Sequence, residues 1–139
     1  MGDVYWFGVF LGLGVGIGVA LAGLVGAVRF GFAAAVVLGG AIGAVLGLAL
    51  AGYEDAIAGG VGGVLGAAGA RQLVSGTVRR GGTRVATAML TALAGLVIAV
   101  LAFIPLVGLV EGLAVPALGA RLRRREPSRY AGLRTLARD

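Results

Sequence analysis

Glycine and alanine recur every fourth residue through the first half of this chain, and no other feature restricts its fold as strongly. The rows are Gly8, Gly12, Gly16 and Ala20; Gly14, Gly18, Ala22 and Gly26; and Ala35, Gly39, Gly43, Gly47 and Ala51. Residues four apart share one face of an α-helix, so each row would let another backbone approach closely. In water each glycine would weaken a helix by about 1 kcal/mol relative to alanine. In hydrocarbon an unpaired backbone group costs far more, so the rows predict membrane helices packed through small residues.

Composition agrees with a membrane location. The chain is 59% hydrophobic with a mean hydropathy of +1.02, and only 13% of its residues are charged, against roughly a quarter in a soluble domain. Cysteine, histidine and lysine are absent, so disulfides, thiol chemistry and the commonest general base are excluded. Ser75 and Ser128 have no histidine or lysine to activate them. We therefore expect a non-enzymatic protein with no cofactor and no metal site.

Apolar segments predict an all-α, polytopic transmembrane bundle of about five short glycine-rich spans. They cover residues 4–28, 30–52, 56–70, 85–104 and 105–120. The third and fifth are short for a 30 Å hydrocarbon core and could be re-entrant. In a four-span alternative the fourth helix runs on to residue 110. The polar segment 71–84 is expected to be a loop with a short helical start. Residues 1–120 would be the bundle, and 121–139 a basic cytoplasmic tail interrupted at Pro127.

Charge predicts the orientation. With five crossings and the N-terminus outside, all twelve arginines lie on the cytoplasmic side, and Asp3, Glu54 and Asp55 lie outside. Four crossings would instead translocate the arginine-rich tail. The chain is therefore expected in the inner, cytoplasmic membrane of a cell, with its C-terminus in the cytoplasm. The net charge of +6 then reflects orientation, and no nucleic-acid partner is expected.

A weak internal repeat is also visible. Shifting the chain by 50 residues aligns 43–71 with 93–121 and matches the endings Gly69-Ala70-Arg71 and Gly119-Ala120-Arg121. Biased composition alone would produce some of the identities. Two repeated helical hairpins are therefore one interpretation of the alignment.

Three groups of polar residues are candidate sites. Glu111 would lie within the apolar layer, where an ionisable side chain suggests a proton or ion site; the alternative is a position at headgroup level. Thr87 and Thr91 could line a polar path, or could bond to the carbonyls of their own helix. Glu54 and Asp55 could bind a cation or be a solvated turn. An arginine cluster is expected to contact anionic headgroups or a partner, and consists of Arg121, Arg123, Arg124 and Arg125.

Helix packing is predicted at Gly8, Gly12, Gly16, Gly39, Gly43, Gly47, Gly62 and Gly66. The pattern Gly62-Gly66-Ala70-Arg71, within residues 8–120, resembles the small glycine-zipper multi-pass proteins of bacterial inner membranes. This resemblance concerns packing and implies no functional residue. The favoured hypothesis is a structural or accessory subunit that joins a homo-oligomer or a membrane-protein partner in the lipid bilayer. The alternative is an oligomeric channel or small transporter that uses Glu111 and the Thr87/Thr91 face.

Overall fold

The structure, a computed structural model, is helical and shows no strand in the residues it describes. These are 2–26, 28, 30–79, 83–104 and 106–130, with side chains described at all of them except 78, 79 and 124–130. The helices are α1 (Gly2–Val25), α2 (Gly31–Leu50), α3 (Tyr53–Arg79), α4 (Arg84–Leu101) and α5 (Val107–Tyr130). The prediction of an all-α protein is confirmed. Of these helices α1, α2 and α4 are long and apolar enough to cross a membrane.

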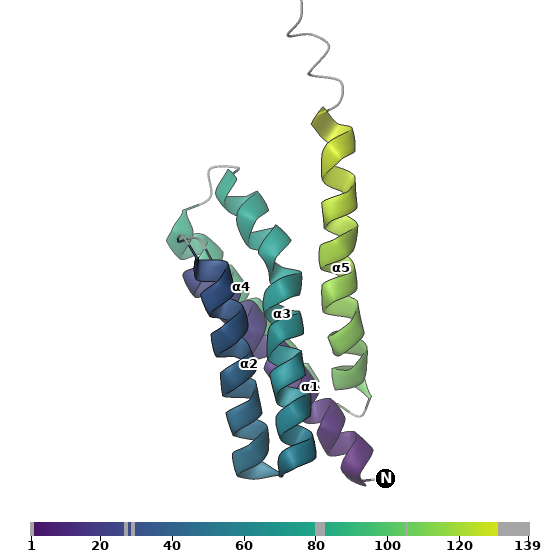
Figure 1. Cartoon of the computed structure of the whole chain (residues 1–139). Helices are drawn as coiled ribbons and strands as arrows, with labels where there is room; N and C mark the ends of the chain where they lie inside the picture. Colours follow the sequence, from purple (N-terminus) through teal and green to yellow (C-terminus); the bar gives the residue numbers. More distant parts are fainter. Residues whose placement is uncertain (1, 27, 29, 80–82, 105, 131–139) are drawn as a thin grey trace, which may run out of the picture.

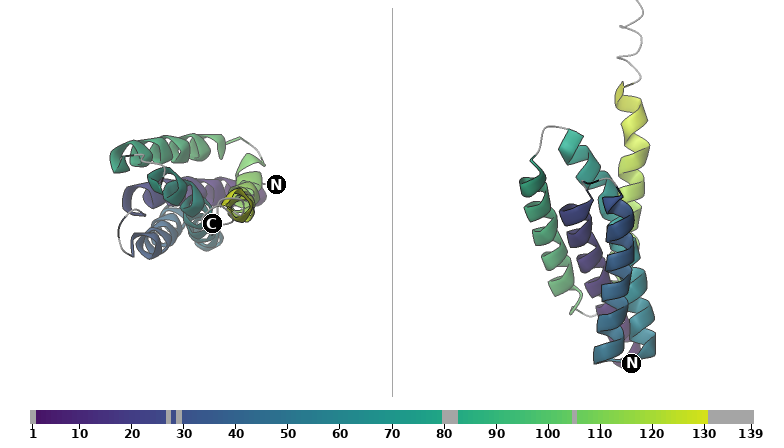
Figure 2. Two further views of the ribbon diagram at one scale, coloured as in Figure 1. Left: turned by 90° about the horizontal axis from the view of Figure 1, so that it is seen from above. Right: turned by 60° about the vertical axis from the view of Figure 1, so that its left-hand side comes forward.

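Successive helices run in alternating directions (Figure 1). The N-terminus, the α2–α3 turn and the α4–α5 turn lie at one end of the bundle, which we call the N-terminal end. The α1–α2 and α3–α4 connections lie at the opposite end, which we call the arginine end. Viewed along the bundle, α1 and α3 form the centre, and α2, α4 and α5 surround them (Figure 2). Glycine allows the α2–α3 turn, since Gly52 has φ 128°.

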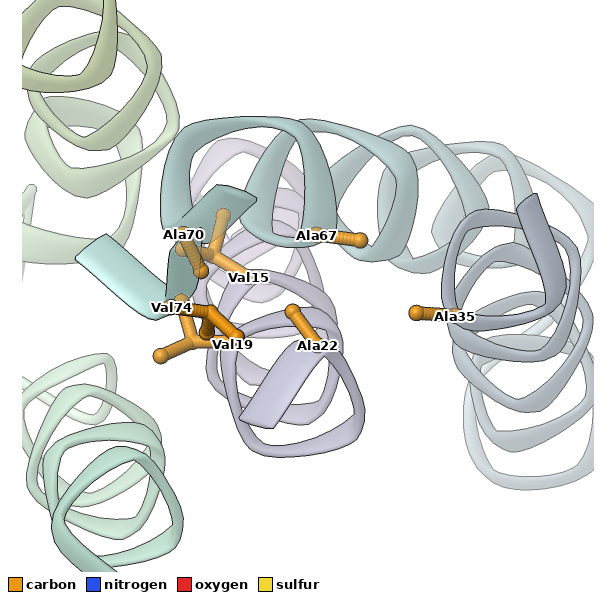
Figure 3. Close-up of a cluster of buried hydrophobic side chains, with 7 residues drawn as sticks. All are labelled: Val15, Val19, Ala22, Ala35, Ala67, Ala70 and Val74. Carbon is orange, nitrogen blue, oxygen red and sulfur yellow. The ribbon is translucent and has the colours of Figure 1, made fainter. Parts of the chain in front are cut away.

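Alanine and valine side chains form the main core cluster, and many large apolar side chains face outward. The main cluster, drawn in Figure 3, consists of Val15, Val19, Ala22, Ala35, Ala67, Ala70 and Val74. In contrast, Val37 of α2 is 68% exposed, Leu93 of α4 is 58% exposed and Leu113 of α5 is 77% exposed. A protein in water rarely exposes so much contiguous apolar surface. This distribution of side chains suits a surrounding of hydrocarbon.

Helix α3 corrects the sequence interpretation of residues 71–84 as a loop. The helix continues to Arg79, and only residues 80–83 separate it from α4. Val74 explains the continuation, because it is 4% exposed and packs into the core cluster. The polar side chains also fit a helix, since the hydroxyl of Thr77 donates to the carbonyl of Leu73 one turn earlier. Burial of one apolar residue therefore outweighs the polar composition of its neighbours.

Helix α5 corrects the expected interruption at Pro127. The helix extends to Tyr130 and includes both Pro116 and Pro127. A proline removes one backbone hydrogen bond, and the arginine-rich sequence around Pro127 has high helix propensity, so the loss is local. The C-terminal part of α5 projects beyond the other helices (Figures 1 and 2). The remainder of the tail, including Leu133 and Leu136, lies outside the described residues.

The α4–α5 turn breaks the chain where the five-span interpretation places a break. Helix α4 ends at Leu101, and Leu106 adopts a left-handed conformation with φ 69° immediately before α5. A single helix that continues to residue 110, on which the four-span alternative depends, is therefore wrong, while the number of crossings stays a prediction. The two halves of the suggested repeat pack differently, because α2 lies along α3 whereas α4 and α5 diverge (Figure 2).

Helix α4 begins with a capping threonine, which gives a first testable prediction. The Thr83 side-chain oxygen accepts a hydrogen bond from the Ala86 backbone N–H at 3.2 Å. Thr83→Ala is expected to lower the free energy of unfolding by about 1 kcal/mol, because that N–H loses its partner. Thr83→Ser retains the hydroxyl and is expected to unfold like the wild type in the same thermal assay. Equal stability of all three proteins would show that the cap contributes nothing.

Candidate functional site

Backbone contacts between glycines join α2 to α3. A methyl group added at Gly43 would overlap the carbonyl oxygen of Gly59, and one added at Gly59 would overlap that of Gly43. One turn away, a methyl group at Gly63 would overlap the carbonyl oxygen of Gly39. At the N-terminal end, Gly47 lies against the backbone of Asp55. Only residues without side chains permit this separation of the two helices.

Helix α1 contacts α3 in the same way. Methyl groups added at Gly62 and Gly66 would overlap the carbonyl oxygens of Leu11 and Val15. A methyl group added at Gly18 would overlap the carbonyl oxygen of Gly63. Gly63 in turn lies against the carbonyl of Gly39 of α2. Three backbones from α1, α2 and α3 therefore meet at the level of Gly63.

The other row of α1 faces α4 and α5. A methyl group added at Gly16 would overlap the carbonyl oxygen of Gly95 of α4, and one added at Gly95 would overlap that of Gly16. Nearer the N-terminal end, a Cβ atom added at Gly8 would lie 3.3 Å from Leu109 Cγ of α5. A methyl group added at Gly108 of α5 would overlap the carbonyl oxygen of Gly8. The eight predicted packing glycines thus all lie at contacts between helices of this one chain. The sequence did not indicate which helix each row would meet.

Glu111 lies at the contact of α5 with α1, one turn inside α5. Its residue surface is 9% exposed, and its Oε2 atom is buried with no hydrogen-bond partner among the described residues. A Cβ at Gly12 would lie 2.8 Å from this oxygen, so the glycine makes room for the carboxyl group. The sequence predicted that Glu111 lies within the apolar layer, and no salt bridge to it is found among the described residues. An unpartnered buried oxygen is costly and therefore marks a candidate site.

The two threonines on α4 bond to their own helix. Thr87 is 3% exposed and donates to the Thr83 carbonyl at 3.0 Å. Thr91 is 8% exposed and donates to the Thr87 carbonyl at 2.9 Å, with the Ala88 carbonyl at 3.0 Å. Their hydroxyl protons are thus directed along α4, which leaves none pointing into an open path.

The structure does not bring the threonines and Glu111 together. Thr91 packs against Gly23 of α1, whereas Glu111 packs against Gly12. These glycines are about three turns apart, or roughly 16 Å along the helix axis. Between them, Gly16 and Gly95 bring α1 and α4 into backbone contact. A path from one site to the other between these helices is therefore closed in this conformation.

The arginine cluster begins two residues after Gly119 of α5, which contacts Gly69 of α3. Arg121 and Arg123 are exposed, while the side chains of Arg124 and Arg125 lie outside the described ones. Helix α5 thus exposes two arginines beyond its contact with α3 at Gly119.

A pocket at the N-terminal end was missed by sequence reasoning. Its volume is about 660 Å³, and its lining consists of Asp3, Trp6, Val9, Phe10, Leu13, Leu50, Ala51, Tyr53, Glu54, Asp55 and Phe103. These residues come from α1, the α2–α3 turn and the segment after α4, so only the folded chain places them together. The aromatic cluster near the N-terminus and the acidic pair beside Tyr53 were the available signals.

Comparison with protein families, with curated proteins and with solved structures finds no match for this chain. The fold and its contacts therefore define only a class: an all-helical protein in which three helices are suited to crossing a membrane.

Proposed function

We propose that this chain is a non-enzymatic, multi-pass membrane protein that acts as a structural or accessory subunit of a membrane assembly. The observation that carries the proposal is the use of its glycines. They join backbones of the same chain, as at Gly43–Gly59 and Gly16–Gly95, and leave no polar path between α1 and α4. The outward surface is formed by large apolar side chains. Tight packing within the chain and an apolar outer surface suit a structural role in the lipid bilayer.

All five helices cross the bilayer in this proposal, including α3 and α5. The guanidinium of Arg71 lies 4.5 Å from the centre of the Phe32 ring, which places it level with the start of α2. The part of α3 before Arg71 therefore extends over the full length of α2, and the arginine can reach the headgroups at its end. Helix α5 contacts Gly8 of α1 through Gly108 and Gly69 of α3 through Gly119, so its apolar part lies against both central helices.

Orientation follows from the same arrangement. Asp3, Glu54 and Asp55 lie at the N-terminal end, and Arg71, Arg84 and Arg121 belong to the opposite half. We therefore place the N-terminus outside and the C-terminus in the cytoplasm of an inner membrane. Attaching a reporter that is active only in the cytoplasm should give signal at the C-terminus and none at the N-terminus. The reverse pattern would overturn the orientation.

The part of the chain from Arg121 onward is the proposed contact to a cytoplasmic partner and to anionic lipid. Each exposed arginine near an anionic surface contributes about 1 kcal/mol of attraction. Because the glycine faces are occupied within the chain, an oligomer or a larger complex would use this helix or the outer apolar surface. The rows of small residues are explained by contacts within one chain, so they do not require a contact between copies.

The mass of the particle in nanodiscs, with an inventory of co-purifying chains, tests the proposed role. We expect this chain with a second membrane protein, or with copies of itself, and loss of that association when residues 121–139 are deleted. Because that deletion also shortens α5, Arg121→Gln with Arg123→Gln removes two exposed charges at full length and is expected to weaken the same association in part. Ion or solute flux catalysed by the purified chain alone would overturn the proposal in favour of the channel or transporter, for which the unpartnered Glu111 is the supporting observation.

A further inference from the structure

The pocket at the N-terminal end combines aromatic rings with negative charge. Trp6, Phe10, Tyr53 and Phe103 line it, together with the carboxylates of Asp3, Glu54 and Asp55. Half of the six acidic residues of the chain thus line one cavity, and none of its described lining residues is basic. A volume of about 660 Å³ lies within the range of pockets that bind small organic molecules.

The walls of the pocket are fixed by contacts that do not depend on a ligand. The Tyr5 hydroxyl donates to the Phe103 carbonyl at 2.9 Å, which ties α1 to the segment after α4. The Trp6 ring packs against Phe10 with centroids 6.2 Å apart and contacts Tyr5 edge-on at 5.4 Å. On the opposite side, the close approach of Gly47 to the Asp55 backbone holds the acidic turn against α2. These contacts hold together the elements around the pocket, to which Trp6 and Tyr53 contribute exposed rings.

We propose that this pocket binds an organic cation with an apolar body, of the quaternary ammonium type. Aromatic faces attract such cations through the ring quadrupole, and the surrounding carboxylates supply complementary charge. A phosphate-bearing or carboxylate ligand would instead meet three like charges. No described arginine is among the residues that line the pocket, so no positive side chain there offsets the three carboxylates.

Trp6 gives a direct measurement, because it is the only tryptophan of the chain and lines the pocket. The probe is benzyltrimethylammonium, and the control probe is neopentylbenzene, which has the same shape without the charge. We expect the cation to cause a saturable change in Trp6 emission in nanodiscs, and the neutral compound to cause none. Absence of saturation with the cation, or equal responses to both compounds, would overturn the proposal and leave an apolar crevice open to lipid.

Neutral variants of the acids test the role of charge. Glu54→Gln with Asp55→Asn is expected to weaken cation binding about tenfold, because shape is retained while two charges are removed. Glu126→Gln, on the projecting part of α5, is the matched control and should bind as the wild type does. Asp3→Asn alone, at an exposed position in the first turn of α1, should weaken binding about threefold and remains informative if the double variant fails to fold. Unchanged affinity in the acidic-pocket variants would overturn the proposal.

Discussion

Gly63→Leu is expected to destabilise the bundle strongly. A methyl group at this position would already overlap the Gly39 carbonyl of α2. The Gly63 carbonyl in turn occupies the position that a methyl group on Gly18 of α1 would need. A leucine must therefore separate α3 from α2 and disturb its contact with α1. The expected loss in the free energy of unfolding is about 3 kcal/mol, at the upper end of the effects of overpacking.

Helix α3 supplies its own control for this prediction. Gly76 lies in the same helix and has no atom within 4 Å of its Cβ position. Gly76→Leu should leave the melting temperature unchanged or raise it slightly, because leucine has the higher helix propensity. Both proteins would be measured by thermal unfolding and by size-exclusion chromatography in the same detergent. A Gly63→Leu protein that melts and elutes like Gly76→Leu would show that the close helix contacts are not required.

Gly43→Leu is a narrower version of the same experiment. The atoms nearest to a Cβ at Gly43 belong to Gly59 and Gly60, at the contact between α2 and α3. The variant should lose about 2 kcal/mol of stability, somewhat less than Gly63→Leu, because α1 is not displaced. Stability equal to that of the wild type would mean that the row on α2 faces lipid.

Helical periodicity explains why the small-residue faces were visible in the sequence and their partners were not. Residues four apart must share a face, so Gly12 and Gly16 could be grouped without a structure. Glycine has no side chain that distinguishes one neighbouring helix from another. That Gly16 meets α4 while Gly18 meets α3 follows from the packing of the whole chain.

The helix ends and the pocket escaped prediction for different physical reasons. Hydropathy senses the apolar layer, so it could not show that α3 and α5 continue as helices beyond it. Val74 was a weak signal, because one apolar residue within a polar segment does not reveal that it is buried. The pocket depends on Trp6, Tyr53 and Phe103, which are far apart in sequence and meet only after folding.

Glu111→Met is expected to stabilise the protein by about 1–3 kcal/mol. The buried Oε2 atom has no hydrogen-bond partner among the described residues, and an unsatisfied buried polar atom costs free energy of this order. Methionine has a similar length and can occupy the space beside Gly12 without a polar oxygen. Thermal unfolding in nanodiscs would measure the gain. Glu111→Gln retains a polar end without a partner, so it should recover little of that stability.

The same two variants separate the two functional hypotheses. In a structural subunit, Glu111 has no transport step to perform, so Glu111→Met should be more stable, and proteoliposomes of the wild type and the variant should be equally impermeable to protons and cations. In a channel or transporter, the carboxyl group is retained at a cost in stability because it binds the transported ion. Flux that is present in the wild type and absent in both Glu111 variants, with the bundle still folded, would make Glu111 a transport residue and reject the structural role.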